Sequence, residues 1–181
     1  MSQQPNLETE RLLLRPFTLA DAPTVQQLAG DPAIADTTLN IPHPYADGVA
    51  EVWIGDHAKN FNRRHSVTYA ITRRADGQLV GAIGLTLDLR HNRAELGYWM
   101  GQPYWGQGYT TEAARALLAY GFAELDLNKI YATHFARNPA SGRVMQKAGM
   151  AQEGMFPQHV RKGGQYEDLV FYGILQADFD S

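Results

Sequence analysis

Hydrophobic and polar residues alternate with a period of two along several short stretches of the chain, and this alternation predicts β-strands. Three such stretches follow one another at residues 66–72, 79–89 and 93–101, with turn sequences between them, and predict a meander. The dipeptide Asp76-Gly77 is a strong signal for a hairpin between the first two strands. Four further strands are predicted at residues 10–17, 128–136, 150–157 and 166–175.

The N-terminal part also contains the pattern of two helices. The first follows Thr18, a candidate N-cap with Asp21 three residues later, and is predicted to run to about Gly30. Residues 31–48 are rich in Pro, Asp and Asn and predict a loop. A second helix is predicted over residues 49–63, and its buried candidates include Val52, Trp53 and Phe61.

Two more helices are predicted in the C-terminal part. The stretch "QPYWGQGYTTEAARALLAYGF" (residues 102–122) becomes an amphipathic helix whose buried face is formed by Ala114, Leu117, Leu118, Gly121 and Phe122. The stretch "RNPASGRVMQKAGM" predicts a short helix. In it Asn138 is the N-cap, Pro139 takes the first helical position and Gly149 follows the last turn.

The predicted order of elements is β-α-α-β-β-β-α-β-α-β-β, which indicates an α/β (α+β) fold with about seven strands and four helices. The crossover from the strand at 93–101 through the central helix to the strand at 128–136 would make these two strands parallel neighbours. With 181 residues, the chain is long enough for one compact domain, and we expect residues 1–181 to form a single domain.

Composition narrows the choice of partner. The net charge is −3 and no block of Lys and Arg stands out, so nucleic acid is not an expected partner. No apolar run approaches the ~20 residues that span a bilayer, and the N-terminus lacks the pattern of a signal peptide, so we expect a cytoplasmic protein without membrane contact. The chain has no Cys, which excludes disulfides and a thiolate nucleophile.

The glycines before the central helix indicate a site for a small anion. The first N–H groups of a helix are unpaired and attract phosphate, and Gly106 and Gly108 would let an anion approach the backbone closely. Tyr109 and Thr110 follow where a nucleotide-binding P-loop needs Lys and Ser/Thr, and Thr111 stands where a dinucleotide-binding loop needs its third glycine. A pyrophosphate held without metal fits the loop, although a tight turn with no ligand fits it equally well.

Several motifs together resemble the GNAT acyl-CoA-dependent N-acetyltransferases, and are most similar to their RimJ/RimL-type branch of ribosomal-protein N-terminal acetyltransferases. They are "YWGQGYTTEA", "NPASGRVMQKAGM", "LETERLLLRPFTLAD", "YAITRRADGQLVGAIGL", "AELGYWM" and "GGQYEDLVFYGIL", and they extend over nearly the whole chain. The family's loop pattern, Gln/Arg-x-x-Gly-x-Gly/Ala, falls on residues 105–110. Here Trp105 replaces the first Gln/Arg and Thr110 replaces the last small residue.

The resemblance implies a GNAT-like, mostly antiparallel twisted sheet whose central parallel pair splays apart, and acetyl-CoA as the acetyl donor. It implies that the loop amides hold the pyrophosphate and that the pantetheine arm pairs with the main chain at the end of the strand at 93–101. The cofactor-binding residues expected on this basis are Trp99, Met100, Gln107, Gly108, Tyr109, Thr110, Thr111, Asn138 and Ser141. Ser141 would also lie near the thiol as a possible acid.

Acetyl transfer to an amine needs a neutral amine, a stabilised oxyanion and a protonated leaving thiolate. Glu95 is the candidate base, acting through water, although a surface carboxylate that pairs with Arg93 is the alternative. The amide of Met100 is a candidate donor to the thioester carbonyl. Tyr98 and Tyr109 are assigned to packing rather than to catalysis.

The acceptor pocket is expected between residues 40–48, the first two helices and the closing hairpin, where Tyr45, His159, Arg161 and Asp168 could line it. A protein N-terminus is favoured as the acceptor by the resemblance alone, and aminoglycosides, polyamines and amino acids remain open. The six His show no metal-ligand spacing, so no metal is expected. A non-catalytic acyl-CoA sensor and a protein-interaction module are the alternatives to an enzyme, and a homodimer is compatible with the resemblance.

Overall fold

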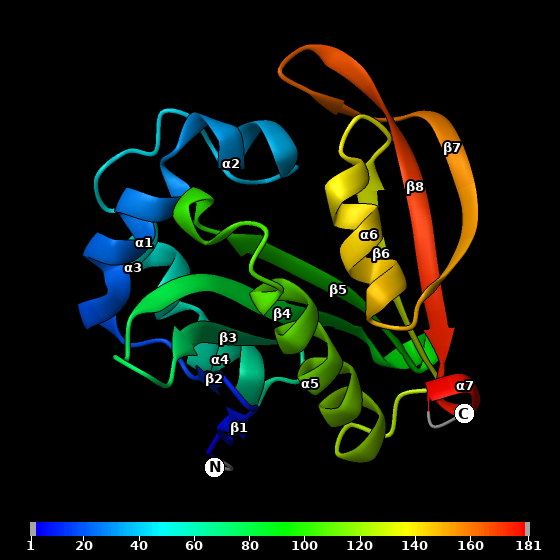
Figure 1. Ribbon diagram of the computed structural model, residues 1–181, viewed down its shortest axis with the longest axis horizontal. Coiled ribbons are helices and arrows are strands. Elements are labelled where there is room, and N and C mark those ends of the chain that lie inside the picture. The colour runs from blue at the N-terminus through cyan, green and yellow to red at the C-terminus, as the bar shows by residue number, and fades with distance from the viewer. Residues whose placement is uncertain (1–2, 180–181) are drawn as a thin grey trace.

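The computed structural model describes residues 3–179 of the chain. Its centre is one eight-stranded sheet with the strand order β1-β2-β3-β4-β5-β6-β8-β7 (Figure 1). The strands are β1 (Leu7–Glu8), β2 (Leu12–Arg15), β3 (Ser66–Arg73), β4 (Leu79–Asp88), β5 (Arg93–Met100), β6 (Lys129–Phe135), β7 (Ala151–Lys162) and β8 (Gln165–Leu175).

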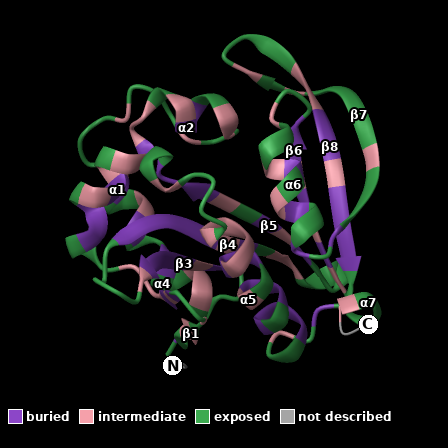
Figure 2. Ribbon diagram, viewed as in Figure 1, coloured by how far each residue is buried: buried purple, intermediate pink, exposed green. Residues whose placement is uncertain are grey.

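The helices form two apolar clusters with the sheet. They are α1 (Ala22–Ala29), α2 (Pro32–Thr37), α3 (Val49–Gly55), α4 (His57–Asn62), α5 (Tyr109–Ala123), α6 (Pro139–Lys147) and α7 (Gln176–Phe179), with 3-10 turns at Leu19–Asp21, Leu89–His91 and Gln102–Tyr104. The larger cluster joins α5 and α6 to the sheet, and the smaller one joins α1, α2 and α3 to β3, β4 and β5. Figure 2 shows that β4 is largely buried and that β5 and β8 alternate between buried and more exposed positions, whereas β7 is exposed along most of its length.

The sheet is antiparallel except between β5 and β6, and these two strands separate. They pair only where Arg93, Ala94 and Glu95 face Lys129, Ile130 and Tyr131, although both strands continue beyond that point. Figure 1 shows β5 and β6 running apart from this short ladder. The fold class is therefore confirmed, including the parallel central pair that diverges.

Several predicted elements differ in detail. The two-residue strand β1 raises the strand count from the predicted seven to eight. The predicted loop at 31–48 contains helix α2, because Asp31 caps it by accepting a hydrogen bond from the Ala33 amide at 2.8 Å and Pro32 takes the first helical position. The Thr18–Asp21 pair forms as predicted, and the Thr18 amide donates to the Asp21 carboxylate at 2.8 Å.

The helix predicted over 49–63 is broken into α3 and α4. Because α3 ends at Gly55, the two halves do not share one continuous buried face, and the prediction that Val52 is buried is wrong: its side chain is 71% exposed. Trp53 and Phe61 are partly buried, as expected. Helix α7 was not predicted. Within residues 3–179, no helix is both long enough and apolar enough to cross a membrane.

Candidate active site

Two cavities adjoin at the diverging ends of β5 and β6. The loop cavity, of about 400 Å³, is lined by the end of β5, the glycine-containing residues 104–111 and helix α6. The sheet cavity, of about 570 Å³, is lined by residues of β3, β4 and β5, by side chains from α1, α3 and α4, and by the end of β6. Both are lined by Thr37, Thr38, Tyr98, Trp99 and Ser141, so they meet at these residues.

The loop cavity has the main-chain shape of an anion site. Gly106 and Gly108 adopt left-handed conformations with φ of 73° and 81°, which only glycine reaches without strain. Helix α5 begins directly after Gly108, so its first N–H groups are available to a ligand. A Cβ atom at Gly106 would meet nothing within 4 Å, which leaves open space over the backbone. This geometry fits a pyrophosphate.

The structure brings together almost all of the residues predicted to bind the coenzyme. Trp99, Met100, Gly108, Tyr109, Thr110, Thr111, Asn138 and Ser141 all line the loop cavity, whereas Gln107 does not. Asn138 precedes α6 as predicted, but its side chain makes no capping hydrogen bond. The side-chain amide of Asn138 is therefore not used to cap α6 and is available to a ligand in the cavity. Arg143 and Lys147 also line the cavity and add positive charge to it.

An arginine from the N-terminal region fixes the glycine loop in place. Arg11 Nη1 donates to the Gln107 carbonyl oxygen at 3.0 Å, and Arg11 Nε donates to Glu112 Oε2 at 2.7 Å. The other oxygen of Glu112 accepts a hydrogen bond from the Thr9 hydroxyl at 2.6 Å. These contacts neutralise a carboxylate that stands in the first turn of α5, where it would otherwise repel an anion. No local pattern in the sequence predicts this contact, because about a hundred residues separate its members.

The free edge of β5 faces the gap. Because the Gly101 amide donates to the Val80 carbonyl at 2.8 Å, the alternating pattern of an antiparallel pair turns the backbone polar groups of Tyr98 and Met100 away from β4. They point toward β6, which no longer pairs there. The Met100 carbonyl accepts a hydrogen bond from Trp105 Nε1 at 2.6 Å. Trp105 thereby orders the chain between β5 and the glycine loop.

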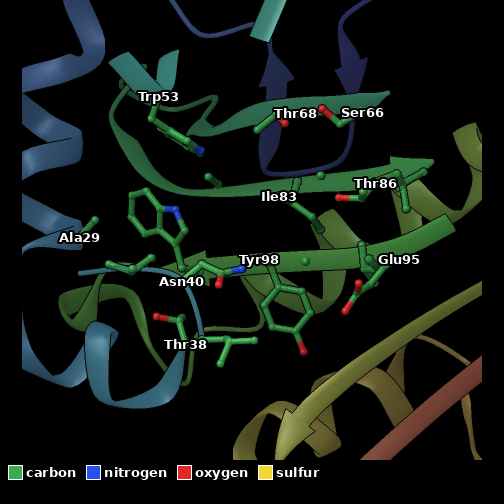
Figure 3. A pocket seen from close by; sticks show the side chains of 18 of the residues that line it. Ala29, Thr38, Asn40, Trp53, Ser66, Thr68, Ile83, Thr86, Glu95 and Tyr98 are labelled. Atoms are coloured by element: carbon green, nitrogen blue, oxygen red, sulfur yellow. The ribbon is translucent and has the colours of Figure 1, made fainter. Parts of the chain in front are cut away.

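Glu95 lines the sheet cavity at the last paired position of β5, and Figure 3 shows its carboxylate pointing toward the side where β6 lies. Burial raises the pKa of the Glu95 carboxyl above its ordinary value, and hydrogen bonds with Tyr131 and Thr133 oppose that rise. Arg93 pairs with Asp88 instead, at 3.1 Å. The alternative in which Glu95 serves as the partner of Arg93 is therefore not what the structure contains.

Tyr98 and Ser141 form a hydrogen-bonded pair where the cavities meet. Their hydroxyl oxygens lie 2.8 Å apart, and Tyr98 Oη lies 3.1 Å from the Ser141 carbonyl oxygen. Burial raises the pKa of Tyr98 to about 12, so its hydroxyl stays protonated at neutral pH. The sequence alone predicts a packing role for Tyr98. The alternation along β5 gave no sign that its hydroxyl would meet helix α6.

The residues predicted to line the acceptor pocket divide into two groups. Tyr45 lines the sheet cavity, whereas His159, Arg161 and Asp168 line neither cavity. His159 packs on the rings of Phe156 and Phe171, Arg161 lies over the Tyr166 ring, and Asp168 accepts a hydrogen bond from the Gln158 amide. These side chains make their contacts within the β7–β8 hairpin. His57, which was not predicted to line this pocket, lines it together with Trp53, which was expected to be buried on the second helix.

Comparison with known proteins gives a consistent picture. The family described as "Acetyltransferase (GNAT) domain" matches residues 11–151. The uncharacterized N-acetyltransferase YnaD of Bacillus subtilis is 31% identical over 180 residues, which cover 97% of this chain and 99% of that protein. The putative ribosomal N-acetyltransferase YdaF of the same organism is 35% identical over 106 residues, or 58% of each chain. A solved GNAT-family acetyltransferase from Bacillus anthracis is 29% identical and superimposes with a TM-score of 0.80, over 96% of this chain and 99% of that one.

Proposed function

Because the chain belongs to the GNAT acetyltransferase family, we propose that it transfers the acetyl group of acetyl-CoA to a primary amine by direct attack, with a protein N-terminal α-amine as the first acceptor to test. The chain is an acyltransferase and acetyl-CoA is its donor. One observation carries the proposal. The loop cavity and the sheet cavity meet beside the diverging ends of β5 and β6, so a donor in one would face an amine in the other.

The donor would occupy the loop cavity. The first amides of α5 and the open backbone at Gly106 and Gly108 would receive the pyrophosphate, with Arg143 and Lys147 adding positive charge. The amide-bearing pantetheine arm would lie in the gap and satisfy the backbone groups on the free edge of β5. The Met100 amide would then donate a hydrogen bond to the thioester carbonyl oxygen.

Glu95 would prepare the amine. An α-amine has a pKa of about 7.7–8.0, so roughly a tenth of it is neutral at pH 7 and a modest base suffices. The raised pKa of Glu95 brings it closer to that of the amine, which makes it a better base. Its place on β5, next to the gap, suits the transfer of a proton through an intervening water.

Ser141 and Tyr98 would deliver the proton that the departing thiolate needs. If Tyr98 directs its one hydrogen to Ser141 Oγ rather than to the Ser141 carbonyl oxygen, the hydrogen of Ser141 is free to point into the loop cavity, where the thiol would lie. The amine nitrogen bonds to the acyl carbon and gives one proton through water to Glu95. The carbonyl then re-forms as the carbon–sulfur bond breaks, and the sulfur takes up a proton from Ser141. The chain has no Cys and no activated-serine motif, so no covalent enzyme intermediate is part of the proposal.

The name of one relative makes a protein N-terminus the first acceptor to test, since YdaF is described as a putative ribosomal N-acetyltransferase. The test is a thiol-release assay with acetyl-CoA over several amine classes, followed by intact-mass measurement of any peptide that reacts. We expect thiol release that depends on the amine and a mass gain of one acetyl group. Binding of acetyl-CoA without thiol release for any amine would favour a non-catalytic sensor and contradict the proposal.

A further inference from the structure

The floor of the sheet cavity is a three-by-three patch of residues on one face of β3, β4 and β5. Strand register aligns three rows across these strands, and every second residue of a strand faces the same side. The rows are Ser66–Thr86–Glu95, Thr68–Gly84–Gly97 and Ala70–Ala82–Trp99, and all of these residues except the fully buried Ala70 line the cavity. The middle row contains two glycines, so the floor is lowest at its centre.

Gly97 is the open point of this floor. A Cβ atom built on Gly97 would meet nothing within 4 Å, whereas one on Gly84 would meet the Val67 carbonyl oxygen at 2.7 Å. Gly97 is not required by an unusual backbone angle, because it is absent from the glycines with positive φ. A glycine inside a strand weakens it, so its presence needs a reason. Here the absence of a side chain leaves space in the cavity that a part of the acceptor can occupy.

The two ends of the floor differ in chemistry. At one end Ser66 and Thr86 offer hydroxyls beside the Glu95 carboxylate (Figure 3). At the other end Trp99 and Trp53 belong to one apolar cluster. Glu95 and Trp99 are four residues apart on one strand, or about 13 Å. This distance accommodates an amine at the polar end and one ring-sized group at the aromatic end.

The walls of the sheet cavity carry little charge. Among the lining residues within 3–179, the acidic ones are Glu95 and Asp56, and none is Lys or Arg. His57 packs against Phe17 and Trp53, and its two ring nitrogens are buried without a hydrogen-bond partner. Burial lowers the pKa of His57 to about 4, so the His57 side chain is neutral at pH 7.

We propose that the acceptor is a primary amine carried beside an apolar group of aromatic size, which lies over Gly97 against Trp53 and Trp99 while the amine faces Glu95. A polyamine or an aminoglycoside would bring several cations to a cavity with only two carboxylates, so some of these cations would be buried without an opposite charge. A free amino acid would bring a carboxylate to a cavity without a cation. The proposal rests on the proposed function and names the chemistry of its acceptor.

The first test compares acceptors in the thiol-release assay. Phenylalaninamide should give a kcat/KM at least tenfold higher than glycinamide, spermidine or free phenylalanine, because only it combines the ring with an otherwise uncharged body. A peptide that begins with Phe separates the two sources of this chemistry. A value close to that of phenylalaninamide indicates a free amine, a much higher one indicates a polypeptide N-terminus, and both support the proposal.

The second test fills the floor. Gly97→Val should raise the KM for phenylalaninamide at least tenfold, leave that for glycinamide within about twofold, and leave the Kd for acetyl-CoA unchanged. The matched control is Gly55→Val, which adds the same side chain over open space at the end of α3, outside both cavities. Unchanged acetyl-CoA binding and thermal melting establish that the Gly97 variant is folded.

Each failure has a distinct meaning. Faster reaction with spermidine or glycinamide than with phenylalaninamide overturns the inference and leaves the proposed function standing. An unchanged KM for phenylalaninamide in the folded Gly97→Val variant also overturns it, because the ring then does not lie over Gly97. Absence of thiol release with every amine overturns the proposed function and the inference with it.

Discussion

The two cavities that meet beside β5 are built from different parts of the chain. The loop cavity is shaped by main chain, through two left-handed glycines, the first amides of α5 and the free edge of β5. The sheet cavity is shaped by side chains from distant elements, such as Trp53 and His57, and by the missing side chain of Gly97. We therefore expect substitutions in the loop cavity to weaken acetyl-CoA binding whichever amine is the acceptor. Substitutions in the sheet cavity should change only the binding and reaction of the amine.

The largest expected effect tests the loop cavity, which is shaped by main chain. Gly108→Glu places a carboxylate at the anion site and a side chain at φ of 81°, so we expect the Kd for acetyl-CoA to rise more than 100-fold in calorimetry. Gly77→Glu is the matched control, since Gly77 also has a positive φ, of 71°, and lies in open space in the β3–β4 hairpin. Normal acetyl-CoA binding by the Gly108 variant would show that the loop cavity is not the donor site.

Glu95→Gln tests the sheet cavity and should slow the acetyl transfer step without changing acetyl-CoA binding. We expect kcat at pH 7 to fall about 100-fold, with the Kd for acetyl-CoA within twofold of normal. In the unmodified protein, kcat/KM should fall as the pH drops through the raised pKa of Glu95, and the variant should lose that inflection while keeping the one due to the amine. Glu124→Gln, at the exposed end of α5, is the control. An unchanged pH profile in the Gln variant would rule Glu95 out as the base.

His57→Phe tests whether the stability of the sheet-cavity wall around Trp53 depends on a neutral imidazole at position 57. His57 has a folded-state pKa of about 4, below that of the unfolded chain, so its contribution to stability is present above about pH 6.5 and is lost as the pH falls toward 4. Between pH 7 and 4.5 we expect the free energy of unfolding to fall by about 2 kcal/mol less in the variant than in the unmodified protein. Urea titrations at both pH values measure this, with the exposed His91→Gln as control. Equal losses in both proteins would contradict the assignment.

The smallest expected effect concerns the contact that fixes the glycine loop. Arg11→Ala removes a donor to the Gln107 carbonyl and leaves the Glu112 carboxylate with fewer partners, so acetyl-CoA should bind about three- to tenfold more weakly. The KM for the amine should stay unchanged. Lys129→Ala, which breaks the pair with Glu153 outside both cavities, is the control and should alter neither. A larger effect on the amine than on acetyl-CoA would break the division between the two cavities.

The same division explains what could be predicted from the sequence. The donor half lies in contiguous motifs, where glycine spacing and a following amphipathic helix define one local backbone shape. Trp99, Met100 and Gly108 were therefore found without a structure, and each lines the loop cavity. The roles of these residues stay predictions, because no bound coenzyme tests them.

The acceptor half was harder to predict because its lining depends on how separate elements pack. The prolines and Asp residues of 31–48 indicated a loop, although Asp31 and Pro32 are good residues for the start of a helix. Treating 49–63 as one helix hid the turn that brings His57 beside Trp53. His159, Arg161 and Asp168 were predicted to line the pocket because the closing hairpin was expected to border it, and the contacts within that hairpin were not visible from the sequence.

The short ladder between β5 and β6 also has a mechanical consequence. Within the described sheet, strands β1–β5 and strands β6–β8 are joined to one another by only the pairing of Arg93–Glu95 with residues 129–131. The two parts of the sheet can therefore move relative to each other about this short ladder. A pantetheine arm that bonds to the free edges of both β5 and β6 would restrict that movement. Coenzyme occupancy should then slow amide hydrogen exchange on both sides of the cleft, well beyond the atoms that it touches.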